Sequence, residues 1–292
     1  MKYHFRTVYL VSALVCLLTA VSAQAGDAFK PFVLASQGSG TVADKIQVVK
    51  DAVTTAGFDV VGEYAPYEGA HIVIVSNDSL KQNAAQSDFG GYGAVQRISI
   101  TQAKEQVQVA YTNPRYTASI YRMTGDLADV ATALEGALGN MNEFGATNAR
   151  SADDLKKYHY MAFMPYFDDH LTIGKYDSYE DAISKVEQGL ANSKAVNQLY
   201  RVDIPGKEES VFGVSILEGA GADKSVMEKI DTDLLKHTAH LPYEILVSGG
   251  KAYTQHGKFR IAMSSPDLGM GTFMKISDAP DAIELTLKAA IK

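Results

Sequence analysis

Cysteine is almost absent from this chain of 292 residues, and tryptophan is absent altogether. The one cysteine, Cys16, lies within an expected export signal, so we expect the mature chain to contain none. This composition excludes a thiol nucleophile, a cysteine-ligated zinc site and an iron–sulfur cluster. An exported chain without disulfides must be stabilised by its hydrophobic core, which favours the periplasm over a small secreted module.

A long apolar run suited to a membrane span is also missing. Lys2 and Arg6 precede a short apolar stretch, residues 7–20, and Ala23-Gln24-Ala25 supplies the small residues that a signal peptidase requires. The stretch is too short for a typical transmembrane helix. We therefore expect residues 1–25 to be a cleaved signal peptide. The protein is then periplasmic or secreted, with no membrane insertion after cleavage.

Basic clusters are the third absence. The chain has 27 Lys and Arg against 34 Asp and Glu, a formal net charge of −7, and no basic stretch interrupts this excess. Nucleic acid and anionic lipid surfaces are therefore not expected partners. The expected partner is an unknown small molecule or a periplasmic protein.

Apolar side chains at helical spacing occur in two matching segments. Thr41 and Asp44 form a capping pair before the first segment, and Ser178 and Asp181 form one before the second. The apolar positions are Val42, Ile46, Val49 and Val53 in the first segment and Tyr179, Ile183, Val186 and Leu190 in the second. The repeated pattern predicts two equivalent helices and indicates a tandem duplication.

Further predicted elements follow both helices in the same order. Strands are expected at residues 31–36, 58–62, 70–77, 94–100 and 105–112 in the first half, and at 169–174, 197–204, 210–217, 241–247 and 257–263 in the second. Closing helices are expected around Val130, Leu134 and Leu138, and around Ile283, Leu287 and Ile291. Pro266 is expected to match Pro114.

The pattern predicts an α+β fold of two similar units related by a pseudo-twofold axis. Each unit would have a mainly antiparallel sheet with helices on one face. A polar, Gly/Asn/Ala-rich segment, residues 140–157, places the boundary near residue 150. The expected domains are residues 26–150 and 151–292, which together form a pseudo-dimer within one chain.

The order of elements, the strand LPYEILV at residues 241–247 and the glycine turn SGGK at 248–251 carry a resemblance to a known family. The chain resembles the DUF302 family, also called the TT1751-like fold, over residues 30–140 and 168–292. The resemblance implies an α+β unit that dimerises and has no agreed activity. Many members carry a Cys-Asn-Pro motif after the apolar strand. The matching positions here are Ser76-Asn77-Asp78 and Ile216-Leu217-Glu218, so no thiol role is carried over.

Two segments are candidates for ligand binding. Residues 111–123 are rich in tyrosine and arginine, which can stack on and pair with an anionic or aromatic ligand. Tyrosines that merely cover a sheet edge are the alternative. Residues 157–170 are expected to converge with this run at the junction of the units. The candidate ligand-binding residues are Tyr111, Asn113, Arg115, Tyr116, Tyr166, Asp168 and Asp169.

The second segment also suggests a metal site. His159, Met161, Met164 and His170 offer imidazole and thioether ligands that suit periplasmic copper. A strap whose aromatic and methionine side chains fill a groove between the sheets is the alternative.

A histidine pair offers further metal ligands. His237 and His240 are three residues apart on a helix expected from Lys224, and this spacing could place both rings on one copper or zinc ion. A partly buried structural histidine at position 237 is the alternative.

Catalytic motifs are not found. The G-x-G-x-x-A pattern at residues 38–43 is explained by a flexible turn into a capped helix, because its repeat partner has one glycine. A G-x-S-x-G elbow does not occur. We therefore expect an exported, DUF302-like, non-catalytic module that binds a small ligand or acts as an accessory protein, without a cofactor. The alternative is a periplasmic copper or zinc handling protein.

Overall fold

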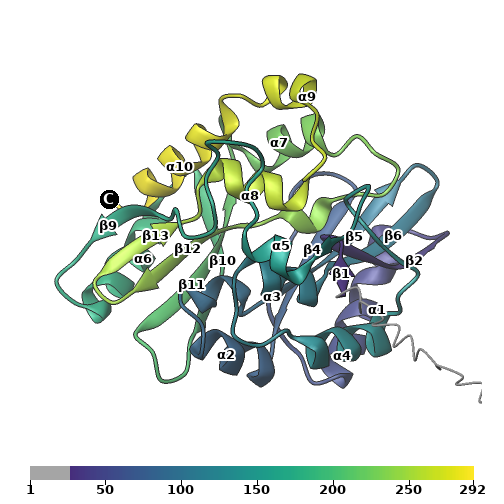
Figure 1. Ribbon diagram of the computed structural model, residues 1–292, viewed down its shortest axis with the longest axis horizontal. Coiled ribbons are helices and arrows are strands. Elements are labelled where there is room, and N and C mark those ends of the chain that lie inside the picture. The colour runs from purple at the N-terminus through teal and green to yellow at the C-terminus, as the bar shows by residue number, and fades with distance from the viewer. Residues whose placement is uncertain (1–26) are drawn as a thin grey trace, which may run out of the picture.

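The structure is a computed structural model that describes residues 27–292. It combines helices with antiparallel sheets, as expected for an α+β protein (Figure 1). The expected signal peptide lies outside the described residues. Among the described residues, no helix has the length and apolar character needed to cross a membrane.

The first half of the chain forms a six-stranded antiparallel sheet with the strand order β3-β4-β5-β6-β2-β7. Its strands are β2 (Phe32–Gly38), β3 (Asp59–Tyr64), β4 (Ala70–Ser76), β5 (Gln96–Ala103), β6 (Gln106–Thr112) and β7 (Asn142–Phe144). Its helices are α1 (Val42–Thr55), α2 (Asp78–Ala85), η1 (Gly90–Gly93), α3 (Pro114–Ile120) and α4 (Ala128–Leu138).

The second half forms a five-stranded antiparallel sheet with the order β10-β11-β12-β13-β9. Its strands are β9 (Leu171–Lys175), β10 (Val196–Asp203), β11 (Glu209–Ile216), β12 (Tyr243–Ser248) and β13 (Lys251–Thr254). Its helices are α6 (Tyr179–Asn192), α7 (Asp223–Ile230), η2 (Thr238–His240), α8 (Gly257–Ser264), α9 (Met270–Lys275) and α10 (Ala279–Ala290). Strands β1 (Ala28–Phe29) and β8 (Arg150–Ser151) pair as a separate antiparallel sheet, and helix α5 (Ala152–Lys156) follows β8 directly.

The two capped helices form as predicted. The Thr41 hydroxyl accepts a hydrogen bond from the Asp44 N–H at 3.2 Å, and the Asp44 carboxylate accepts one from the Thr41 N–H at 3.0 Å. Ser178 accepts from the Asp181 N–H at 3.1 Å. These bonds satisfy N–H groups that a helix leaves without partners at its start, so α1 and α6 begin at the predicted residues.

Both faces of the first sheet are covered. Helices α1 and α4 pack on one face, where alternate residues such as Val33, Val109 and Tyr111 are buried. The intervening residues Phe32 and Ala110 point to the opposite face, where η2 of the second half packs. Period-two alternation therefore places two different apolar sets on the two faces.

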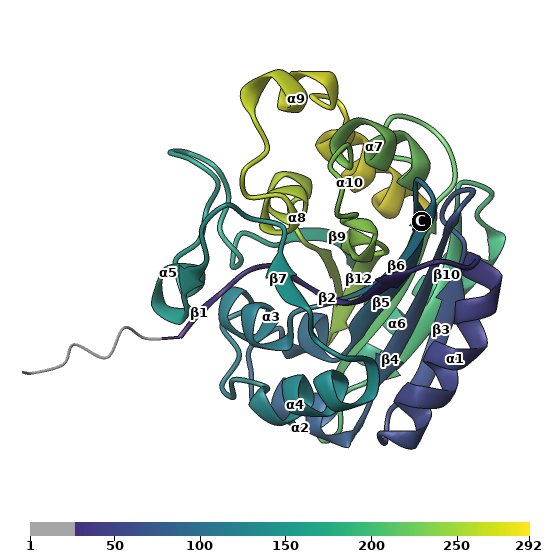
Figure 2. The same cartoon turned by 90° about the vertical axis from the view of Figure 1, so that its right-hand side faces the viewer.

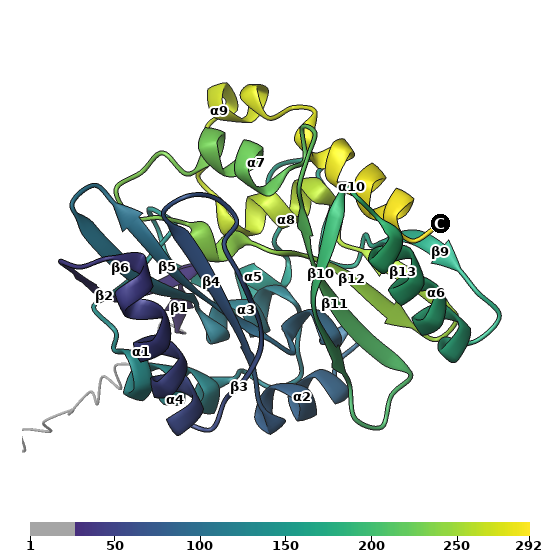
Figure 3. The same cartoon turned by 180° about the vertical axis from the view of Figure 1, so that it is seen from behind.

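The buried apolar side chains of the two halves form one hydrophobic core. The halves also meet along two strands (Figures 2 and 3). Strands β3 and β10 lie side by side between α1 and α6. Gly62 permits this approach, because a Cβ there would lie 2.7 Å from the Leu199 carbonyl oxygen. The turn η1 packs on β11 and β12, with the Gly91 N–H donating to Glu209 Oε1 at 2.8 Å.

The strand predicted at residues 257–263 is wrong. These residues form helix α8, and the strand that pairs with β12 is β13, which follows the two-residue turn Gly249-Gly250 directly. Every residue of α8 except Lys258 is buried. A segment that is buried on all sides has no regular spacing of polar and apolar residues, and this spacing is the signal that distinguishes a helix from a strand in a sequence. Pro114 lies in the first turn of α3, after the capping residue Asn113, whereas Pro266 follows the end of α8, which His256 caps. The expected match between Pro266 and Pro114 is therefore wrong.

The helix predicted from Lys224 to the histidine pair is also wrong. Helix α7 ends at Ile230, and the chain then forms a loop before η2. The carboxylate of Asp231 accepts a hydrogen bond from the His237 N–H at 2.9 Å, which closes this loop. His237 precedes η2 and His240 ends it, so the two rings are not related by α-helical spacing.

Candidate functional site

Three predicted ligand residues line one small cavity. Tyr111, Asn113 and Arg115 surround a space of about 260 Å³ between β6, α4 and the segment before β7. Their polar groups are already engaged: the Tyr111 hydroxyl donates to the Gly139 carbonyl at 3.3 Å, and the Asn113 amide donates to the Lys30 carbonyl at 3.1 Å. The fold brings these residues together, but the polar groups of Tyr111 and Asn113 bind backbone carbonyls of the protein itself.

Arg115 is paired within the chain. Its Nη2 lies 2.7 Å from Asp27 and 3.6 Å from Asp126, and its guanidinium lies over the Phe29 ring. The cavity wall also includes the acids Glu135 and Glu143. Carboxylates therefore outnumber the one arginine, which disfavours an anionic ligand at this position.

The remaining candidate ligand residues lie elsewhere. Tyr116 is buried, and its hydroxyl donates to the Met263 carbonyl at 2.7 Å. Asp168 forms an ion pair with Arg122 at 2.8 Å, and the Asp169 carboxylate accepts from the Tyr166 N–H at 2.8 Å. None of these residues lines the cavity beside Tyr111.

Residues 157–170 pack as a strap over the contact between the halves. The Tyr158 hydroxyl donates to the Ala262 carbonyl at 3.0 Å, and the buried Phe167 ring stacks on Tyr121 with centroids 5.1 Å apart. These contacts match the alternative in which aromatic side chains fill a groove.

The predicted metal residues of this segment have different surroundings. His159 Nδ1 lies 2.8 Å from the Met161 carbonyl, and both side chains are at least partly exposed. The His170 ring lies against Phe89 at 4.1 Å between ring centroids, and burial lowers its pKa to about 4. Met164 is half-buried. Among the residues described, no group of three or more His, Cys, Asp or Glu is arranged to hold a metal ion.

The rings of His237 and His240 also have different surroundings. His237 Nδ1 is 3.4 Å from Ser265 Oγ, and burial lowers the pKa of the ring. His240 is buried, with Nδ1 3.0 Å from Arg260 Nη1 and Nε2 3.3 Å from the Tyr243 hydroxyl. Arginine can only donate, so His240 Nδ1 is the acceptor. Burial and the Arg260 charge hold the pKa of His240 well below its usual value, so the ring is neutral.

His237 opens onto a larger cleft between the halves, which we call the junction cleft. It has a volume of about 600 Å³. Its lining comprises residues 144–147 from the first half and Ile230, Thr232, Asp233, Leu234, Leu235, His237, Ser265, Asp267, Leu268, Gly269 and Thr272 from the second. The lining combines apolar side chains, hydroxyls and two aspartates, with no lysine or arginine.

Hydrogen bonds across the halves hold the walls of the junction cleft. The Gln108 side chain donates to the Leu234 carbonyl at 2.9 Å and accepts from the Lys236 N–H at 3.0 Å. Asp267 accepts from the Thr147 N–H. The loop that carries His237 is therefore fixed to the first sheet, which makes the cleft a preformed feature.

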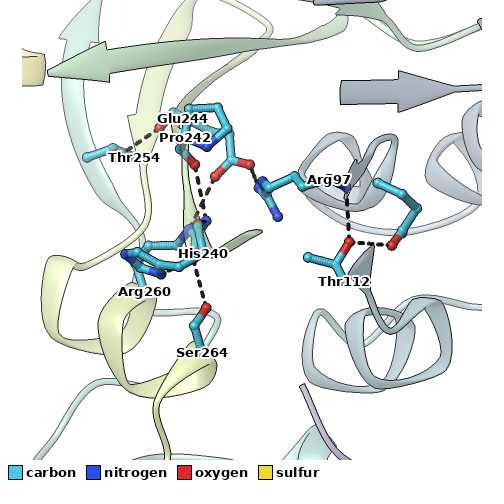
Figure 4. A network of polar contacts seen from close by, with 9 residues as sticks. Arg97, Thr112, His240, Pro242, Glu244, Thr254, Arg260 and Ser264 are labelled. Carbon is cyan, nitrogen blue, oxygen red and sulfur yellow. Dashed lines mark hydrogen bonds and ion pairs between the residues drawn. The ribbon is translucent and has the colours of Figure 1, made fainter. Parts of the chain in front are cut away.

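Close to η2 lies a buried ionic cluster that joins the two sheets (Figure 4). Glu244 on β12 pairs with Arg97 on β5 and, at 3.4 Å, with Arg260 on α8. The side chains are at most 3% exposed. Arg260 also donates to the Pro242 carbonyl at 3.1 Å and to Ser264 at 3.2 Å. Through Arg260, the cluster fixes the orientation of the His240 ring at the end of η2.

A second buried acid connects the halves. Asp223, the first residue of α7, accepts hydrogen bonds from the Tyr64 hydroxyl at 2.9 Å and the Ile216 N–H at 3.1 Å. It is 2% exposed. Burial raises its pKa to about 7, although both hydrogen bonds and the Arg260 charge oppose this shift.

We expect Asp223 to make the fold less stable as the pH rises. Its folded pKa of about 7 lies above the ordinary value of 3.8, so the unfolded state releases the proton first. The contribution is complete below the unfolded pKa and is lost as the pH rises through the folded one, at up to about 1.4 kcal/mol per pH unit. Asp223→Asn should remove this slope. Urea unfolding of both proteins at pH 5, 6, 7 and 8 measures it.

The difference between the two proteins is the informative quantity in this experiment. His170 titrates in the opposite sense, because its folded pKa is lowered to about 4, while Asp231 has a pKa raised by burial to about 6. His170 and Asp231 contribute equally to the pH dependence of stability in the wild type and in Asp223→Asn, so their contributions cancel in the difference. Asp203→Asn, at an exposed acid paired with Arg201, is the control and should keep the wild-type slope. Parallel curves for wild type and Asp223→Asn would contradict the prediction.

Sequence reasoning did not single out Arg97, Glu244, Arg260 or Asp223. A signal was available for two of them: Arg97 and Glu244 are the single charged residues in the strand segments VQRISI and LPYEILV. A charged residue in the middle of a buried strand requires a partner.

Comparisons with family models, with curated proteins and with solved structures found no match to this chain.

Proposed function

We propose that this chain is an exported, non-catalytic module of two DUF302-like units that binds a small molecule in the junction cleft. The observation that carries the proposal is the cleft itself. Its volume of about 600 Å³ falls in the usual range for small-molecule sites. It is lined by both halves, in keeping with a ligand site at the junction of the units.

The matching of the two halves supports a duplicated unit with a pseudo-twofold axis. The two sheets connect their strands in the same order. The order is β3-β4-β5-β6-β2 in the first and β10-β11-β12-β13-β9 in the second, so in each the strand that comes first in sequence pairs with the one that comes last. The bulge between Val60 and Gly62 has a counterpart between Gln198 and Tyr200. Contacts across the halves are reciprocal, because η1 packs on β11 and β12 while η2 packs on β4 and β5. A duplication of this kind supplies each unit with the surface that a dimer would provide.

The lining indicates the class of ligand. Asp233 and Asp267 contribute negative charge, and no lysine or arginine lines the cleft. Leu234, Leu235 and Phe144 provide apolar surface. The proposed ligand is therefore a small amine with an apolar body, whose ammonium group lies near the aspartates and whose remainder contacts the leucines.

A binding role agrees better with the geometry than a hydrolytic one. Ser265 and His237 lie near each other in the cleft, at 3.4 Å between Oγ and Nδ1. A Ser–His pair needs a carboxylate on the second ring nitrogen to orient the base. In the described part of the chain, no such carboxylate contacts the His237 ring, so we assign these groups to ligand contacts.

Ligand binding is tested with 2-phenylethylamine and its neutral analogue 2-phenylethanol. We expect the amine at about 100 times its dissociation constant to raise the Tm of residues 26–292 by roughly 5–10 °C. The alcohol should have little effect, because it lacks the charge that pairs with the aspartates. Differential scanning calorimetry provides the measurement, and Asp233→Asn/Asp267→Asn should abolish the shift.

The control variant Glu135→Gln/Glu143→Gln changes the charge of the smaller cavity beside Tyr111 by the same amount. It should keep the shift in Tm. Loss of the shift in this variant, with full retention in Asp233→Asn/Asp267→Asn, would place the ligand in the cavity beside Tyr111 and reject the junction cleft.

One observation favours the metal-handling alternative. Both ring nitrogens of His170 are buried without a hydrogen-bond partner among the described residues, and an unprotonated imidazole is a suitable ligand for copper or zinc. Native mass spectrometry of protein purified from a periplasm separates the alternatives. Copper or zinc near one ion per chain, lost in a His159, Met161, Met164 and His170 multiple mutant, would support this function over the binding of an amine.

A further inference from the structure

The outer edges of the two sheets differ at equivalent strands. In the first sheet, β7 pairs in antiparallel orientation with the outer edge of β2, matching Phe144 with Phe32 and Asn142 with Leu34. Strand β9 has the same place in the second sheet, next to the last hairpin strand. Within the described residues, β9 is the edge of its sheet and no strand covers it. Figures 1 and 3 show it at the periphery of the molecule.

An open edge strand exposes backbone N–H and C=O groups that can pair with another extended segment. Charged residues, proline or a covering loop usually protect such an edge. Here β9 carries the exposed Lys175, but it has no proline and its Thr172 and Gly174 are at least partly exposed. The edge is therefore able to accept a strand.

A groove runs beside this edge. It has a volume of about 610 Å³ and lies between β9, the outer turns of α6 and the end of α10. Gly189 allows α6 and α10 to meet at its floor, because a Cβ there would lie 2.5 Å from the Ala290 carbonyl oxygen. A groove between an edge strand and a helix is the geometry in which peptides bind by strand addition.

The charge of the groove differs from that of the whole chain. Its lining includes Lys175 and Lys185 and no aspartate or glutamate side chain, although the chain has a formal net charge of −7. Lys175 and Lys185 are exposed and form no ion pair among the described residues. An occupant with carboxylate groups would therefore be favoured.

The first half shows the chemistry of such an occupant. Strand β7 contributes three residues, Asn142–Phe144, to the edge of β2. Glu143 accepts a hydrogen bond from the Lys30 N–H at 2.8 Å, and the Phe144 ring packs on Phe32 at 5.5 Å between centroids. A short extended segment with one acid and one apolar anchor is thus sufficient to cover this edge.

We propose that the β9–α6 groove binds an extended acidic peptide segment of a partner protein, which adds to β9 as an antiparallel strand. Backbone pairing along Leu171–Lys175 provides affinity, and Lys175 and Lys185 select carboxylates. The junction cleft is not involved, so this site is independent of the small-molecule function proposed above.

The test uses a fluorescein-labelled octapeptide with the sequence of residues 140–147, NMNEFGAT, which contains β7. Fluorescence anisotropy with residues 26–292 should show saturable binding. Lys175→Glu/Lys185→Glu should weaken it by about tenfold or more, because both lysines that attract the glutamate of the peptide become acids that repel it. The control Lys224→Glu/Lys229→Glu changes the net charge equally on α7, outside the groove, and should bind like wild type.

Backbone methylation of the peptide tests strand addition without altering the protein. Two probes are compared, each N-methylated on alternate residues so that one loses the amides facing β9 and the other loses those facing solvent. One probe should bind at least about tenfold more weakly than the other. Equal affinity of the two probes, absence of binding at millimolar protein, or binding that is unchanged by Lys175→Glu/Lys185→Glu would overturn the proposal. So would a wild-type dimer, seen by light scattering, that this variant converts to a monomer.

A negative result for peptide binding would not bear on the proposed small-molecule site in the junction cleft. Asp233→Asn/Asp267→Asn should bind the octapeptide as wild type does, and Lys175→Glu/Lys185→Glu should keep the Tm shift with 2-phenylethylamine. Each variant therefore reports on one site only.

Discussion

Replacing Glu244 with glutamine is expected to lower the free energy of unfolding by about 3–5 kcal/mol. Glutamine has nearly the same shape, so the change creates no cavity. It removes the negative charge from between Arg97 and Arg260, which are both buried and both remain cationic. Two like charges in the interior then lack a counter-ion, and water cannot solvate them. Urea unfolding at pH 7 measures the effect as a lower midpoint at an unchanged m-value.

A second substitution should recover part of this loss. Arg97→Met in the Glu244→Gln background removes one uncompensated charge and leaves Arg260 with its carbonyl and Ser264 acceptors. The double variant should therefore be more stable than Glu244→Gln alone. Glu187→Gln is the surface control, since its pair with Arg201 is partly exposed to solvent and should contribute no more than about 1 kcal/mol. A loss for Glu244→Gln that merely equals the control would show that the buried cluster contributes little.

Local signals explain which parts of the fold were predictable. Helices α1 and α6 have capping residues and an apolar stripe at helical spacing, and both signals depend on residues within four positions of one another. Helix α8 was missed because nearly all of it is buried, which removes the contrast between its faces. The end of α7 was missed because it depends on the Asp231 carboxylate, which closes the following loop through the His237 N–H.

The polar sites depend on contacts that sequence spacing does not contain. Arg97 and Glu244 come from different sheets, and Tyr64 on β3 and Asp223 on α7 come from different halves of the chain. The junction cleft includes His237, which sequence reasoning identified, but its other walls come from segments that only the tertiary fold brings together. The convergence expected between residues 111–123 and 157–170 occurs through Arg122 and Asp168, whereas Tyr111 and Asn113 line a separate cavity.

Gly213, in the centre of the second sheet, leaves space for the large side chain of Tyr200 on the neighbouring strand. Gly213 lies on β11 between Tyr200 on β10 and Glu244 on β12. The buried Tyr200 ring lies across it, at the position where a side chain of residue 213 would stand. A glycine inside a buried strand is a sequence signal for such a close approach.

Gly213→Ala is therefore expected to cost about 1–3 kcal/mol, because the new methyl group overlaps the buried Tyr200 ring and forces it out of place. Urea unfolding of Gly213→Ala, Tyr200→Ala and the double variant forms a double-mutant cycle. In the Tyr200→Ala background the methyl group has free space, so Gly213→Ala should cost almost nothing there. Gly136→Ala in α4, where a Cβ meets no atom within 4 Å, is the matched control and should stabilise the protein by about 0.5–1 kcal/mol. If Gly213→Ala costs the same with and without Tyr200, backbone conformation at Gly213, and not the overlap with the ring, accounts for the glycine.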